Sequence, residues 1–150
     1  MKARYIVVLA LSSSLMLPAE AGGELALWRR LVPVVEQGAV RSPTLARVLE
    51  DVRALDGVQV SVTQRPQPSS RMRAHATLRV DRSARPVRVD GEVLLPVGRS
   101  EPVLLSLLAH ELAHVLQQAG ILVPGDDDPR GEEQATAIER AVLAELAPRG

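Results

Sequence analysis

The residue types and spacing that most clearly predict chemistry are those of His110, Glu111 and His114, which form an HExxH pattern. On a helix, residues four apart lie about 40° apart on one face, so both imidazoles can bind one tetrahedral metal ion. Glu111 lies about 100° around from His110, beside the metal rather than among its ligands. A carboxylate in that position can accept a proton from water that the metal activates. The pattern therefore predicts a zinc site, with Glu111 as the general base.

The helix that would position these residues is predicted over residues 102–119 and is amphipathic. Most of its apolar residues fall on one broad arc, whereas the histidine pair, Glu111 and the two glutamines that follow share the other arc. Ser100 can cap the helix and Gly120 can end it. The sequence also allows a simpler alternative, in which the histidines belong to a solvated helix face and bind nothing.

A catalytic zinc site also needs a third protein ligand and an open position for water. The sequence has no cysteine and only one further histidine, His75, so the candidate ligands are carboxylates. Glu132 and Glu133 begin the last predicted helix, after a loop long enough to fold that helix back onto the first. Acidic residues at a helix start also complement the helix dipole, which is an alternative explanation for both glutamates.

Two helices are predicted upstream of the site. Apolar residues at helical spacing predict the first helix over residues 24–37, with Gly38 at its end. Ser42 and Pro43 predict the N-cap and first position of the second helix, which Gly57 closes.

Alternating apolar and polar residues then predict a small, mostly antiparallel sheet within an α+β fold. Strands are expected at residues 58–63, 74–80, 86–89 and 92–97. Asp90 and Gly91 are typical of a tight hairpin turn between the last two strands. After the histidine helix, Asp128 and Pro129 predict the start of a C-terminal helix that ends near Leu146.

The N-terminus predicts export. Lys2 and Arg4 precede an apolar run over residues 5–17, and Ala19-Glu20-Ala21 has the small-x-small form of a signal peptidase site. The run is shorter than the ~20 residues of a spanning helix, which argues against the alternative of an uncleaved anchor. We expect a signal peptide over residues 1–21, cleavage after Ala21, and a secreted or periplasmic protein without stable membrane insertion. Residues 22–150 are then expected to form a single domain.

Composition limits the partners and the sources of stability. The formal net charge is zero and 1% of residues are aromatic, so the sequence predicts no nucleic-acid binding by charge or by base stacking. Without cysteine, a disulfide framework and thiolate ligands are excluded. Stability must come from packing of aliphatic side chains, to which a bound metal would add. The oligomeric state is left open.

Three motifs occur in a fixed order along the second half of the chain: GEVLLP at residues 91–96, LAHELAH at residues 108–114 and EQA at residues 133–135. This order resembles the gluzincin branch of the zincin metallopeptidases and is most similar to their minimal, ImmA/IrrE-type members. The resemblance covers roughly residues 91–141 and implies a minimal zincin-like domain. It implies that His110, His114 and Glu133 bind zinc.

The same resemblance implies that Glu111 activates water and leaves the oxyanion partner to be identified. Larger gluzincins use a tyrosine or a histidine there, and the chain has no tyrosine after residue 21. His75 or an arginine would have to take this role. The arginine candidates are Arg73, Arg79, Arg88 and Arg99.

The expected function is that of an exported zinc metallopeptidase that hydrolyses peptide bonds. By analogy with zincins, a peptide or protein substrate would lie extended along an edge strand, for which residues 92–97 are the candidate. Two alternatives stay open. One is a zinc-stabilised binding module with weak or no catalysis, and the other is a metal-free secreted interaction domain.

Overall fold

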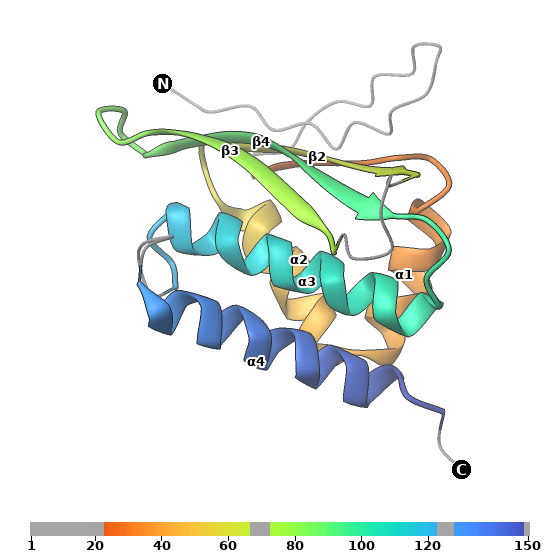
Figure 1. Ribbon diagram of the computed structural model, residues 1–150. Helices are drawn as coiled ribbons and strands as arrows, with labels where there is room; N and C mark the ends of the chain where they lie inside the picture. The colour runs from red at the N-terminus through yellow and green to blue at the C-terminus, as the bar shows by residue number, and fades with distance from the viewer. Residues whose placement is uncertain (1–22, 67–72, 123–127, 149–150) are drawn as a thin grey trace.

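The structure is a computed structural model that describes residues 23–66, 73–122 and 128–148. In this part of the chain a four-stranded sheet forms one layer, and the helices pack against one of its faces (Figure 1). The elements, in chain order, are β1 (Glu24–Leu27), α1 (Val32–Arg41), α2 (Pro43–Ala54), β2 (Val58–Arg65), β3 (His75–Asp81), β4 (Arg88–Pro96), α3 (Glu101–Gln118) and α4 (Pro129–Leu146). The predicted α+β class is confirmed, whereas the predicted signal peptide lies outside the described residues.

The sheet is mixed and mostly parallel, so the prediction of a mostly antiparallel sheet is wrong. Its order is β1-β2-β4-β3, in which β1–β2 and β2–β4 are parallel and only β3–β4 is antiparallel. The connection from β2 to β3 is long enough to carry the chain past one strand position, so that β4 returns between them. The helices α1 and α2 bring the chain back for a second parallel pair, between β1 and β2.

The strand β1 occupies residues that the sequence predicts as the start of the first helix. Leu25 and Leu27 fit a helical spacing with later apolar residues, but they also alternate with polar or small neighbours. In the structure both are buried, beside Val60 and Val62 of β2. The first helix therefore begins only at Val32.

Two glycines that the sequence predicts at the ends of elements lie inside them. Gly38 is within α1 and Gly91 is within β4, so neither the predicted helix end nor the predicted hairpin occurs there. A Cβ at Gly38 would lie 2.3 Å from Leu105 Cδ1, and one at Gly91 would lie 2.5 Å from the Thr77 carbonyl oxygen. Glycine at these positions allows close packing rather than a turn.

Other predicted boundaries are confirmed. Ser42 is the N-cap of α2, and its side chain accepts a hydrogen bond of 3.1 Å from the Leu45 N–H. Gly57 and Gly120 follow the ends of α2 and α3, both with positive φ. Asp128 caps α4, which has the predicted bounds. No described helix combines the length and apolar character needed to cross a bilayer.

The helix α3 is the central element, because it lies between the sheet and α4 (Figure 1). From Leu104 to Gln118, every residue except His114 is buried. The polar arc predicted for this helix is therefore covered as well. Its polar side chains have to find partners inside the protein.

Glu145, near the end of α4, joins that helix to the start of α2. Its carboxylate accepts hydrogen bonds from Ser42 Oγ at 2.5 Å, from Thr44 Oγ1 at 2.7 Å and from the Thr44 N–H at 3.1 Å. Partial burial alone would raise the pKa of Glu145, but the hydrogen bonds from Ser42 and Thr44 outweigh it and hold the pKa below its usual value. The carboxylate also complements the positive end of the α2 dipole.

Replacing Glu145 with Gln should lower the free energy of unfolding at neutral pH by about 1 kcal/mol, because a charged acceptor at a helix start is lost. Since the folded-state pKa is the lower one, this contribution is present above the unfolded-state pKa and is lost as the pH falls through the folded-state pKa. Urea unfolding from neutral pH to about pH 3 should therefore show wild type and Glu145→Gln converging in acid.

The matched control is Glu50→Gln, which changes an exposed glutamate on α2. This variant should show no such pH-dependent difference from wild type. A destabilisation by Glu145→Gln that is equally large in acid and at neutral pH would contradict the proposed role of the charge.

Candidate metal centre

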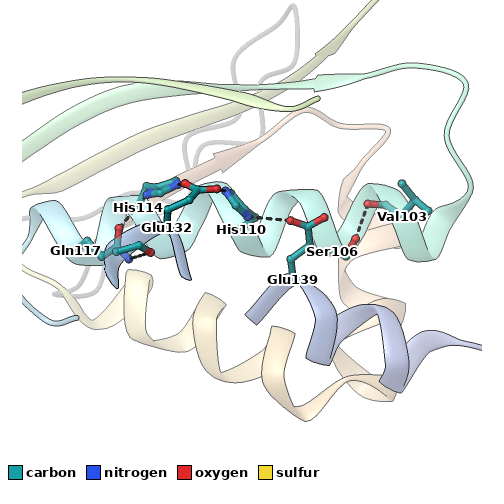
Figure 2. A network of polar contacts seen from close by, with 8 residues as sticks. Val103, Ser106, His110, His114, Gln117, Glu132 and Glu139 are labelled. Atoms are coloured by element: carbon teal, nitrogen blue, oxygen red, sulfur yellow. Dashed lines mark hydrogen bonds and ion pairs between the residues drawn. The ribbon is translucent and has the colours of Figure 1, made fainter. Parts of the chain in front are cut away.

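His110 and His114 lie one turn apart on the same side of α3, as the sequence predicts. Their Nε2 atoms are 3.2 Å apart, and the rings meet edge to face with centroids 4.9 Å apart. Both rings are directed toward the first turns of α4 (Figure 2). Their side chains are 10% and 19% exposed, so both imidazoles are largely shielded from water.

The carboxylate that meets these imidazoles belongs to Glu132. Its Oε1 lies 3.4 Å from His110 Nε2, and its Oε2 lies 3.3 Å from His114 Nε2. Among the described residues, these three form a group whose donor atoms all lie within 4.8 Å of one another. Glu133, the ligand that the resemblance implies, is exposed and is not part of this group. The side chain of Glu132 is itself 62% exposed, so the two glutamates differ in direction and not in burial. One residue along a helix turns the side chain by about 100°, and Glu132 is the one that reaches the two imidazoles.

The other ring nitrogens of the two histidines also face polar side chains (Figure 2). His110 Nδ1 lies 2.9 Å from Glu139 Oε2, within ion-pair distance but without the alignment of a hydrogen bond. His114 Nδ1 lies 2.8 Å from Gln117 Oε1. Metal-bound histidines commonly have a carboxylate or another oxygen acceptor at the second ring nitrogen, which orients the ring.

The donor atoms lie close enough together to share one metal ion. With one ligand atom from each residue, all three atoms lie within 4.8 Å of one another. The two imidazole Nε2 atoms are 3.2 Å apart, near the roughly 3.3 to 3.4 Å that separates donors around a tetrahedral ion with metal–ligand distances of about 2.0 to 2.1 Å. Each Nε2 faces a different oxygen of the Glu132 carboxylate. The carboxylates of Glu132 and Glu139 add negative charge around the imidazoles, which a cation would balance. His110, His114 and Glu132 could therefore hold a metal ion.

Glu111 is a buried residue of α3 whose side chain faces β3. The residue is 8% exposed, and its carboxylate accepts a hydrogen bond from the Ala76 N–H of β3. Burial raises the pKa of Glu111 above its usual value, and the nearby His110, His114 and His75 oppose that rise. A desolvated carboxylate held beside two imidazoles is well placed to accept a proton.

A pocket of about 500 Å³ opens beside this group. Residues of β3, α3 and α4 line it: His75, Ala76, Thr77, Leu78, Glu111, His114 and Glu132. The strand β3 lies at an edge of the sheet, whereas β4 lies between β2 and β3. The prediction of residues 92–97 as an edge strand for substrate is therefore wrong, because β4 is paired on both sides. Among the strands of the described residues, the one with an unpaired edge beside the pocket is β3.

Among the residues considered as oxyanion partners, His75 lines this pocket. It is the first residue of β3 and is exposed. The arginine candidates are not among the lining residues, although all of them lie in described parts of the chain; they are Arg73, Arg79, Arg88 and Arg99. Position therefore favours His75 over the arginines.

Sequence reasoning gave no role at the site to Glu139 or to the side chain of Gln117. Gln117 lies three residues after His114, so the two side chains are neighbours on one face of α3. Glu139 lies seven residues, nearly two helical turns, after Glu132, so the two glutamates share one face of α4. These spacings are the signals from which the two contacts could have been predicted.

Comparisons of the chain with protein-family models, with curated proteins and with solved structures gave no match. The chemistry of the site is therefore inferred from its own residues. Their arrangement is that of a possible metal-binding group, His110, His114 and Glu132, at the wall of a pocket.

Changing the two adjacent glutamates separately tests the third ligand. Glu132→Gln should weaken metal binding by more than the roughly 10- to 100-fold cost typical of losing an outer partner, because it removes a charged donor. Glu133→Gln should leave the affinity unchanged, because that side chain is not part of the donor group. Competition with a chromophoric chelator measures both affinities. A larger loss in Glu133→Gln than in Glu132→Gln would show that Glu133 is the ligand.

Proposed function

We propose that this protein is an exported, zinc-dependent metallopeptidase with a minimal zincin-like domain. The observation that best supports this function is the convergence of His110, His114 and Glu132 beside a pocket that Glu111 also lines. Two histidines and one glutamate are a ligand set of hydrolytic zinc sites, which keep one position open for water. The proposal of export depends on the N-terminal residues 1–21.

In the proposed mechanism Glu111 is the general base. When bound, zinc supplies Lewis acidity that acidifies water and polarises a peptide carbonyl. Glu111 accepts the proton of the attacking water and passes it to the amine nitrogen that leaves. The hydrogen bond from the Ala76 N–H orients the Glu111 carboxylate for this transfer.

The proposed substrate is a peptide or protein segment in an extended conformation. Within the described part of the chain, no strand pairs with the outer edge of β3 beside the pocket, and an extended peptide can add to such an edge through main-chain hydrogen bonds. A peptide in this position would pass His75, at the start of β3, and Glu111. His75 is our candidate for stabilising the negative charge that develops on the carbonyl oxygen.

Glu111→Gln tests the catalytic part of the proposal. The variant should keep its zinc, because the ligands are unchanged, and should lose peptide cleavage by about 100- to 10,000-fold in kcat. Cleavage of a varied peptide library by the mature chain, with zinc analysis of each sample, measures both properties. The control is Glu101→Gln, at the other glutamate of α3, which should retain activity.

One outcome would reject the peptidase function. If wild type and Glu111→Gln both bind zinc and are equally inert across varied peptides, the site does not cleave peptide bonds. The zinc-stabilised binding module would then be the better explanation.

His75→Ala tests the proposed oxyanion partner. The change should lower kcat by about 100- to 1,000-fold with a smaller change in KM, because the interaction is made mainly in the transition state. Zinc affinity should be unchanged. Arg79→Ala, on the same strand, is the control and should behave like wild type. If Arg79→Ala loses kcat and His75→Ala does not, the assignment of His75 is wrong.

A further inference from the structure

Gln117 is a fully buried glutamine, 1% exposed, on α3 one turn after His114. A buried primary amide has an acceptor oxygen and a donor NH2 group to satisfy. Its Oε1 lies 2.8 Å from His114 Nδ1 (Figure 2). Its Nε2 donates to the Gly131 carbonyl oxygen at 2.6 Å and to Gln134 Oε1 at 3.4 Å. The amide therefore links the second histidine to the first turn of α4.

The Gly131 carbonyl determines the direction of these hydrogen bonds. A carbonyl oxygen can only accept, so the side of the Gln117 amide that faces it must be the NH2 group. The amide oxygen then faces His114 and can also only accept, so the Nδ1 of His114 must carry a proton. In a neutral imidazole the other nitrogen is then unprotonated. The lone pair of Nε2 then lies on the side of His110 Nε2 and Glu132 Oε2, which are 3.2 and 3.3 Å away. Because a carboxylate oxygen also can only accept, the partner of this lone pair is a cation held between the three groups and not Glu132 itself.

We propose that Gln117 is a positioning residue that sets the tautomer of His114, so that Nε2 presents its lone pair to the metal-binding group before the metal arrives. A histidine without an acceptor at Nδ1 is free to carry its proton on Nε2, which would block that donor atom. The inference rests on the metal-binding part of the proposed function and not on catalysis.

The same amide also positions the start of α4. Gly131 immediately precedes Glu132, so the hydrogen bond from Gln117 anchors the backbone next to the third donor. One side chain therefore acts on two of the three donors, on His114 through its proton and on Glu132 through its backbone. His110 has a different outer partner, the carboxylate of Glu139.

Three variants separate these effects. Gln117→Met removes both hydrogen bonds at similar size, whereas Gln117→Glu keeps an acceptor for His114 but cannot donate to Gly131. Gln118→Met is the matched control. Gln118 is also a buried glutamine of α3, 5% exposed, but its partner is Arg82 in the turn between β3 and β4, at 2.9 Å.

Nitrogen NMR of the imidazoles in the metal-free proteins measures the tautomer of His114, and chelator competition measures zinc affinity. Wild type and Gln117→Glu should carry the proton on Nδ1. Gln117→Met should move the proton to Nε2 and weaken zinc binding by about 10- to 100-fold. Gln118→Met should change neither property.

Either of two results would overturn the inference. One is the observation that His114 of the wild-type protein carries its proton on Nε2. This measurement tests the predicted tautomer even if Gln117→Met does not fold. The other is a folded Gln117→Met that keeps the Nδ1 proton. Because the tautomer is measured without metal, the inference can hold even if the protein cleaves no peptide. If the protein cleaves peptides but the tautomer of His114 does not change in Gln117→Met, the proposed function stands and this inference is wrong.

Discussion

The burial of α3 between the sheet and α4 is the constraint on which the site depends. A helix at the surface can leave its polar side chains to water, but α3 is covered on its polar side as well. A buried polar group without a partner costs about 1 to 3 kcal/mol. His110, Glu111 and Gln117 must therefore be satisfied by the neighbouring elements. This requirement brings side chains of α4 and the backbone of β3 to the same few residues of α3.

The two neighbours of α3 contribute different parts of the chemistry. The helix α4 supplies the carboxylates that face the histidines, those of Glu132 and Glu139. The strand β3 supplies the backbone N–H that holds Glu111, together with one wall of the pocket. The possible metal-binding group thus lies at the contact between two helices, and Glu111, the proposed base, lies at the contact between a helix and a sheet edge.

Local signals predicted the helices that carry the site, because capping residues and helical spacing act within a few residues. Such local signals predicted the bounds of α4 and the position of His110 and His114 on one side of α3. Local signals did not predict the sheet topology. A short stretch such as β1 fits both a helix and a strand, and the pairing of β2 with β4 is decided by contacts between residues distant in sequence. The choice between Glu132 and Glu133 depends on the rotation of α4 against α3, which packing sets and local sequence does not.

The position of the donors along the chain has a consequence for how the protein is assembled. All three donors and both of their outer partners lie between His110 and Glu139, within one pair of antiparallel helices. The bond between Glu111 and Ala76 instead joins this helix pair to the sheet. The pairing of α3 with α4 is thus sufficient to bring His110, His114 and Glu132 together, whereas the position of Glu111 also requires β3 to be in place.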